Sequence, residues 1–81
     1  MIKIYTITMC PYCSAAKRLL IARGLDFEEI NIHHEGLSRD KLEELTGGRT
    51  VPQIIIDGKP IGGYDNLVIL DQNGELPAPS T

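Results

Sequence analysis

The residues with the clearest chemical potential are two cysteines, Cys10 and Cys13, which are separated by Pro11 and Tyr12. They are the only cysteines in the sequence, so a scaffold of several disulfides joining distant segments is excluded. A bridge across such a short loop restricts the unfolded chain little. The pair is therefore better explained by chemistry than by stabilisation. A Cys-X-X-Cys motif beside a strand–helix–strand pattern is typical of a redox-active dithiol.

Half of a zinc site is the main alternative interpretation of this pair. A structural zinc takes four ligands, and Cys-X-X-Cys supplies two. The sequence has no second such pair, and His33 and His34 are adjacent, so their side chains point in different directions. Two inert buried thiols are a weaker alternative, because Pro11 indicates a helix start beside Cys10.

Cys10 is the expected nucleophile, because disulfide exchange is carried out by a thiolate rather than a thiol. With Pro11 at the first helical position, Cys10 lies at a helix N-terminus, where unpaired N–H groups and the helix dipole favour an anion. Lys17 and Arg18 lie about two turns further along and add little. Cys13 falls inside the first turn and is expected to be less exposed, so we assign Cys10 as the attacking thiol and Cys13 as the resolving thiol.

The elements that must hold this pair are predicted from the spacing of apolar residues and from cap residues. Alternating apolar residues predict strands at 2–7 and 27–32, and the short apolar runs on either side of Asp57-Gly58 predict strands at 53–56 and 59–62. Helices are predicted from Pro11 to Gly24, from the N-cap Ser38 to Gly47, and from an N-cap at Asp65 to Asn73. The apolar residues expected to face the core from the first helix are Tyr12, Ala15, Ala16, Leu19 and Leu20. Those expected from the second are Leu42 and Leu45.

These elements predict one α/β domain over residues 1–81, with residues 76–81 as a flexible tail. The first two strands form a parallel pair with a right-handed crossover. Asp57-Gly58 predicts a hairpin, and Pro60 places the strand that contains it at a sheet edge. The result is a four-stranded mixed sheet with three helices on its two faces, in the order β-α-β-α-β-β-α.

The composition limits the partners that this domain is expected to have. The chain has 81 residues and a formal net charge of -3, which argues against nucleic acid as the main partner, because phosphate binding needs a basic stripe. No apolar run approaches the roughly 20 residues of a membrane span, and the alternating start is too short for a signal peptide. We therefore expect a cytoplasmic monomer.

Three motifs on this topology resemble the glutaredoxins, the small dithiol members of the thioredoxin fold. In family order they are Cys10-Pro11-Tyr12-Cys13, Thr50-Val51-Pro52 and Gly62-Gly63-Tyr64-Asp65, and the resemblance extends from Ile4 to about Leu70. It implies a glutathione-dependent thiol–disulfide oxidoreductase that acts on protein disulfides and glutathione mixed disulfides. Glutathione would be a co-substrate, with no tightly bound cofactor and no metal.

The resemblance also implies where glutathione binds. A cis peptide before Pro52 would place the Val51 backbone beside Cys10 to pair with the cysteinyl part of glutathione. The N-terminus of the last helix, with Gly63, Tyr64 and Asp65, would take the γ-glutamyl group. The implied glutathione-binding residues are Tyr12, Arg49, Thr50, Val51, Pro52, Gly63, Tyr64 and Asp65.

Each of these roles has a simpler structural alternative. The Thr50-Val51-Pro52 segment can be a plain loop with a trans proline, and Asp65 can be a helix cap. Arg49 can hold the glycine carboxylate of glutathione or lie in solvent. Many glutaredoxins have a lysine three residues before the first cysteine, whereas this chain has Ile7. Without a lysine at this position, Arg49 is the residue expected to hold the glycine carboxylate.

Two other functions are compatible with the same residues. One is a redoxin of similar fold that takes electrons from thioredoxin reductase and supplies ribonucleotide reductase. The other is a dimer that holds an iron–sulfur cluster through Cys10 and glutathione, against which Pro11 and Cys13 argue.

Overall fold

The computed structural model describes residues 1–79, and its elements follow the predicted order. The strands are β1 (Ile2–Thr6), β2 (Glu28–Asn31), β3 (Gln53–Ile56) and β4 (Lys59–Gly62). The helices are α1 (Pro11–Ala22), α2 (Arg39–Thr46) and α3 (Tyr64–Gln72). The α/β class and the element order predicted from the sequence are confirmed.

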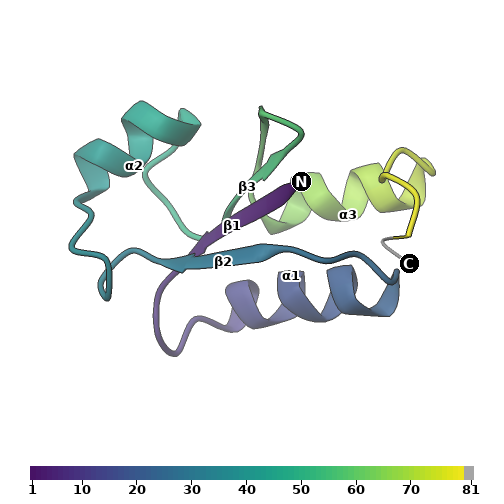
Figure 1. Cartoon of the computed structure of the whole chain (residues 1–81), viewed down its shortest axis with the longest axis horizontal. Coiled ribbons are helices and arrows are strands. Elements are labelled where there is room, and N and C mark those ends of the chain that lie inside the picture. The colour runs from purple at the N-terminus through teal and green to yellow at the C-terminus, as the bar shows by residue number, and fades with distance from the viewer. Residues whose placement is uncertain (80–81) are drawn as a thin grey trace.

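The four strands form one mixed sheet in the order β2-β1-β3-β4 (Figure 1). β1 pairs with β2 in parallel and with β3 antiparallel, and β4 lies at one edge, as Pro60 predicts. Asp57 and Gly58 have φ angles of +50° and +81°, the left-handed conformations that a tight hairpin requires. The central strand β1 leads into the loop that ends at Cys10, and Cys13 follows in the first turn of α1.

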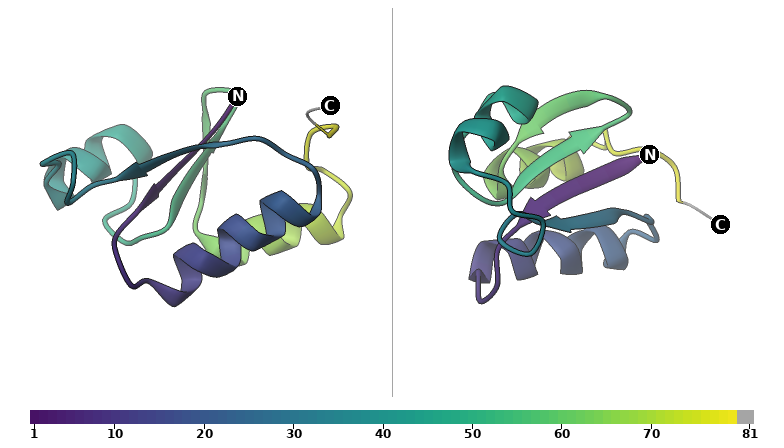
Figure 2. Two further views of the ribbon diagram at one scale, coloured as in Figure 1. Left: turned by 60° about the horizontal axis from the view of Figure 1, so that its bottom comes forward. Right: turned by 60° about the vertical axis from the view of Figure 1, so that its left-hand side comes forward.

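Helices cover both faces of the sheet, and each face has its own apolar core. α1 and α3 lie side by side on one face, and α2 lies on the other (Figure 2). The buried residues of the α1–α3 face are Ile2, Ile4, Ala16, Leu20, Leu25, Ile54 and Leu67. Those of the α2 face are Tyr5, Ile32 and Leu42. The sheet and the first core together fix the position of α1.

Two residues that we expected to face the core are turned away from it. Tyr12 is 64% exposed and Leu45 is 40% exposed. The buried side of α1 is centred on Cys13, Ala16 and Leu20, and Tyr12 is one residue, or about 100° of helical rotation, before Cys13. Tyr12 therefore points towards the surface at the N-terminal end of α1.

The caps follow the sequence except at α3. Ser38 accepts from the Lys41 amide at 3.0 Å, and Gly47 ends α2 with a φ of +84°. At α3, however, the N-cap is Gly63 rather than Asp65, which lies inside the first turn. Gly63 is the cap because β4 ends at Gly62 and α3 begins at Tyr64, so a single residue separates the strand from the helix.

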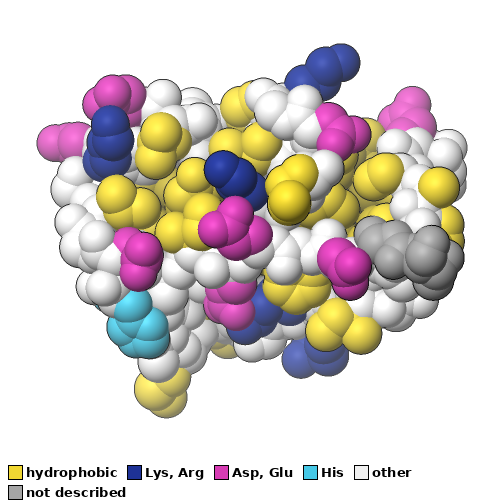
Figure 3. All heavy atoms as spheres, in the orientation of Figure 1, with side chains coloured by type: hydrophobic (Ala, Val, Ile, Leu, Met, Phe, Trp, Pro, Cys, Tyr) yellow, Lys and Arg dark blue, Asp and Glu magenta, His cyan; other side chains and the backbone are white. Residues whose placement is uncertain are grey.

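The C-terminal segment begins against the core. Leu76 packs against the cluster on the α1–α3 face, and residues 80 and 81 lie outside the described residues. The flexible tail at 76–81 stays a prediction. Among residues 1–79, no helix combines the length and apolarity needed to cross a bilayer. On the face in Figure 3, acidic side chains are interspersed with basic ones rather than gathered in one place.

Candidate active site

The two cysteines lie at the N-terminal end of α1, where the sequence predicts them. Cys10 is the N-cap, with an extended backbone (φ -109°, ψ 108°), and Pro11 occupies the first helical position. The sulfur of Cys10 accepts from the backbone N–H of Cys13 at 3.2 Å. That N–H group is one of the unpaired donors of the first turn, so the helix supplies a hydrogen bond to the sulfur as well as a dipole.

The cysteines differ in accessibility, which separates their roles. Cys13 is 2% exposed, whereas Cys10 is partly exposed. The two sulfurs form a disulfide, and the Cα atoms are 5.2 Å apart, inside the usual range for such bonds. A substrate can therefore reach Cys10 first, and Cys13 is close enough to form the internal bond afterwards.

The charges near the pair leave the helix dipole as the main influence on Cys10. The first turn of α1 contains no acidic residue. Lys17 is paired with Glu29, at 3.0 and 3.1 Å from its carboxylate oxygens. Because this pairing offsets its charge, Lys17 contributes little to a thiolate at Cys10.

A groove lies beside the N-terminal end of α1, formed by three segments that are far apart in the sequence. We call it the cis-proline groove, because the peptide bond between Val51 and Pro52 is cis, as predicted. Its volume is about 360 Å³. It is lined by Tyr12, Thr50, Val51, Pro52, Gly63, Tyr64, Asp65 and Asn66.

Close backbone approach explains the glycine in this groove. A Cβ atom at Gly63 would lie 3.3 Å from the carbonyl oxygen of Pro52, closer than most such contacts. Gly63 therefore allows the start of α3 to meet the cis-proline segment. Across the groove, the rings of Tyr12 and Tyr64 have centroids 6.0 Å apart with a tilt of 37°, so they link the starts of α1 and α3.

The N-terminus of α3 faces this groove with its donors available. Within residues 1–79, no side chain caps the first-turn amides of α3. The Asn66 side chain instead accepts from the amide of Gly63 at 3.3 Å. Asp65 is exposed in the first turn. The groove thus ends in a set of N–H donors beside one carboxylate, a pairing suited to a zwitterionic amino-acid group.

Arg49 is the one predicted binding residue that the structure does not bring to the groove lining. Its Nη1 lies 2.5 Å from Asp40 and 3.3 Å from Glu43, both on α2. The hydrogen bond to Asp40, followed by that to Glu43, raises the pKa of the Arg49 guanidinium above its ordinary value. Arg39 also donates to the Arg49 carbonyl at 2.9 Å. Arg49 is therefore held on α2 by exposed ion pairs and does not line the groove.

Two further residues near the site are Ile7, which the sequence analysis noted, and Asn66, which it did not. Ile7 packs against the core on the α2 face, so an apolar side chain occupies the position before the active-site loop. Asn66 lines the groove, although the sequence did not single it out. Its position three residues after the Gly63 cap is the signal that identifies such a residue.

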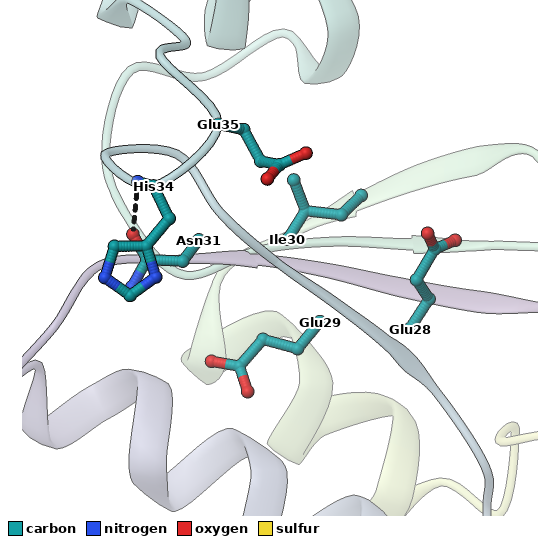
Figure 4. Close-up of a pocket in the computed structure, with 6 residues that line it drawn as sticks. All are labelled: Glu28, Glu29, Ile30, Asn31, His34 and Glu35. Carbon is teal, nitrogen blue, oxygen red and sulfur yellow. Dashed lines mark hydrogen bonds between the residues drawn. The ribbon is translucent and has the colours of Figure 1, made fainter.

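A second hollow lies along the edge strand β2, and we call it the β2 hollow. Its volume is about 390 Å³. It is lined by Glu28, Glu29, Ile30, Asn31, His34 and Glu35 (Figure 4). Glu29 points towards α1, whereas Glu28 and Ile30 point away from that helix (Figure 4). The hollow is therefore bordered by three carboxylates that point in different directions.

Glu29 is the most engaged of these carboxylates. It accepts from the Thr6 hydroxyl at 2.8 Å and from Lys17. Burial alone would raise the pKa of Glu29, but the hydrogen bonds from Thr6 and Lys17 and the charges of Lys17 and His34 bring it below its ordinary value. Among residues 1–79, no group of three His, Cys, Asp or Glu side chains is arranged to hold a metal ion.

The fold and the dithiol together define a class of protein: a thiol–disulfide oxidoreductase of the thioredoxin fold. A sequence profile of the glutaredoxin family matches residues 2–61. The chain belongs to the glutaredoxins and is of the dithiol type, a glutathione-dependent thiol–disulfide oxidoreductase.

Individual relatives agree along almost the whole chain. Glutaredoxin 3 of Escherichia coli K12 is 44% identical over 75 residues, which cover 93% of this chain and 90% of the relative. A glutaredoxin of Pseudomonas aeruginosa is 44% identical over 75 residues, covering 93% of this chain and 89% of its own. The crystal structure of a buckwheat glutaredoxin–glutathione complex superposes with a TM-score of 0.83 at 32% identity, covering 93% of this chain and 71% of that one.

Proposed function

We propose that this protein reduces protein disulfides and glutathione mixed disulfides, with Cys10 as the nucleophile and Cys13 as the resolving thiol. The observation that carries this assignment is the position of Cys10: it caps α1, is partly exposed and accepts a hydrogen bond from the helix, whereas Cys13 is buried. A sulfur held in this way is favoured as a thiolate, and its partial exposure allows it to attack a substrate disulfide.

The first step is common to both substrates. The Cys10 thiolate attacks one sulfur of the substrate disulfide, a new disulfide bond forms, and the other sulfur leaves as a thiolate. With a glutathionylated protein, glutathione remains on Cys10. A second glutathione thiolate then attacks the glutathione sulfur, which yields oxidised glutathione and returns Cys10 to its reduced state.

A protein disulfide needs the second cysteine. After the first exchange the substrate remains bonded to Cys10, and Cys13 attacks the Cys10 sulfur to release it. The product is the Cys10–Cys13 disulfide, and the Cα spacing of 5.2 Å lies inside the usual range for such a bond. Two glutathione molecules then restore the dithiol by the same exchange chemistry.

We assign glutathione to the cis-proline groove. The Val51 backbone pairs with the cysteinyl unit, and the first-turn amides of α3 bind the γ-glutamyl carboxylate. Asp65 accepts from the γ-glutamyl amine, and the Tyr12 ring covers the bound tripeptide. Support for this pose comes from the convergence of these groups and from the buckwheat relative, which was crystallised with glutathione.

The setting and partners are inferred from the chemistry. A reducing cytoplasm keeps glutathione thiols available, so we place the protein there. We also propose that it acts as a monomer. Its macromolecular substrates are disulfide-bearing or glutathionylated proteins, and ribonucleotide reductase remains the predicted candidate among them.

A coupled assay on the wild-type protein tests this function. The mixed disulfide of glutathione and cysteine is supplied with glutathione, glutathione reductase and NADPH, and NADPH consumption is followed. We expect turnover that saturates with glutathione. Turnover only when thioredoxin reductase replaces the glutathione system would overturn the assignment.

A further inference from the structure

Met9, the residue immediately before Cys10, is the most exposed large hydrophobic residue among residues 1–79, at 95%. A side chain exposed to this degree adds nothing to the core. Its backbone φ is +59°, in the left-handed region that favours glycine. Met9 thus combines two unfavourable features, an exposed apolar side chain and a positive φ. A glycine or an asparagine at this position would avoid both.

The comparison with Asp57 shows that the conformation alone does not explain this residue. Asp57 is the other non-glycine residue with a positive φ in the described part of the chain. It lies in the Asp57-Gly58 hairpin, and aspartate tolerates that conformation through its short polar side chain. Methionine cannot form such a local hydrogen bond. The backbone conformation therefore does not explain why a long apolar side chain occupies this position.

The loop holds Met9 in a defined place next to the reactive sulfur. The Thr8 hydroxyl accepts from the Asn31 side chain at 3.2 Å, which anchors the loop to the end of β2. The same Asn31 accepts from the backbone amides of His33 and His34 at 3.1 and 3.2 Å. Met9 therefore projects from a supported turn rather than from a free end.

Met9 also lies outside the site that we assign to glutathione. It lines neither the cis-proline groove nor the β2 hollow. Tyr12, which is 64% exposed, lines the groove on one side of the dithiol. Two exposed residues therefore lie close to Cys10 in the sequence. Tyr12 belongs to the assigned glutathione site, and Met9 does not.

We propose that Met9 contacts the polypeptide of a disulfide-bearing substrate, at an apolar residue that flanks the cysteine under attack. The proposal rests on the function proposed above. An unbranched thioether adapts to differently shaped apolar partners, which suits an enzyme that meets many polypeptides. Met9 would then favour protein disulfides without affecting small mixed disulfides.

The test compares two substrates in the Met9→Gln variant, which keeps the length of the side chain and the strained φ. We expect kcat/KM for reduction of the insulin disulfides to fall about fivefold, as for loss of a partly buried apolar contact. The kcat/KM for the glutathione–cysteine mixed disulfide stays within about twofold of the wild type. An equal loss on both substrates, or no loss on insulin, contradicts the proposal.

Three controls separate a contact from a structural effect. Met9→Leu keeps an apolar side chain and should retain the insulin activity. Ile21→Gln changes a residue that is 65% exposed near the other end of α1 and should alter neither activity. Met9→Gly should raise the melting temperature, because it relieves the positive φ, and yet lower the insulin activity.

The outcomes also distinguish this proposal from the proposed function. If the wild type fails on the glutathione–cysteine mixed disulfide, the proposed function fails. If the wild type succeeds on both substrates and Met9→Gln shows no selectivity, only the role of Met9 fails. The rate of Cys10 alkylation as a function of pH should be the same in wild type and Met9→Gln, since the role is contact with substrate; a shift would contradict it.

Discussion

The cis-proline groove and the β2 hollow have similar volumes, about 360 and 390 Å³, yet differ in what they bring together. The groove joins three distant segments at the end of a helix that begins beside a cysteine. The β2 hollow is formed by residues 28–35 alone, and its best-connected side chain, Glu29, already has partners. Volume therefore does not identify the active site, and the convergence of a nucleophile, free amides and a carboxylate does.

The largest effect is expected for Cys10→Ser. A serine hydroxyl at this position is not ionised at neutral pH, so the helix N-terminus has no anion to stabilise. Turnover of both substrate classes should fall by more than about a thousandfold in the glutathione-coupled assay. Residual activity near the wild-type level would mean that the nucleophile lies elsewhere.

Cys13→Ser separates the two branches of the mechanism. Without a resolving thiol, protein-disulfide reduction should fall at least about a hundredfold, because the intramolecular attack is lost. Reduction of glutathione mixed disulfides should continue. Mass spectrometry of the variant should show glutathione on Cys10. The reverse pattern of activities would mean that the roles of the two cysteines are exchanged.

A matched pair of carboxylate-to-amide changes compares the two hollows directly. Asp65→Asn removes a charge at the start of α3 and should raise the KM for glutathione about tenfold, as expected for a charge-assisted hydrogen bond. Glu35→Gln makes the same change in the β2 hollow and should leave that KM within about twofold. Equal effects would show that overall charge, rather than the groove, controls glutathione binding.

A smaller effect is expected at Arg49, which precedes the groove residue Thr50 in the sequence but does not line the groove itself. Asp40→Asn combined with Glu43→Gln releases Arg49 from α2, and the freed guanidinium becomes available to the glycine carboxylate of glutathione. The KM for glutathione should fall about two- to fivefold, in line with the weak energies of exposed ion pairs. Glu44→Gln is the control, because Glu44 pairs with Lys41 at 3.3 Å and does not contact Arg49 in the residues described. A rise in KM would show that the pairing orders the binding segment.

The smallest effect concerns Glu29, which we expect to affect stability and not activity. Since the folded state lowers the pKa of Glu29, its contribution is present above the ordinary value of 4.5 and is lost as the pH falls through the lower folded value. Glu29→Gln should cost at most about 1 kcal/mol in urea unfolding at neutral pH, and the difference should vanish in acid. A difference that grew on acidification would contradict this assignment.

Local signals in the sequence account for most of the fold and for the dithiol. Pro11 starts α1, Ser38 caps α2, and Asp57-Gly58 makes the hairpin, because each acts through its own backbone conformation or a neighbouring amide. Asp65 was misassigned as a cap since the sequence does not show how closely β4 meets α3. Leu45 was placed in the core because helical periodicity identifies the apolar side of α2 but not how much of that side the core covers.

The site required more than these signals. The motifs predicted which residues line the groove, with the exceptions of Arg49 and Asn66, but their predicted roles came from the family resemblance. The ion pairs of Arg49 with Asp40 and Glu43 depend on where α2 packs on the sheet. The orientation of Tyr12 depends on which side of α1 packs into the core.

The sequence by itself determined the reactive pair, the helix that begins beside it and the order of the elements, because these depend on neighbouring residues. The tertiary structure decided that Tyr12, Val51 and Gly63 meet in one groove, that Lys17 is paired and that Met9 is left exposed. Those outcomes depend on how the helices pack on the sheet, and packing involves contacts between residues far apart in the chain.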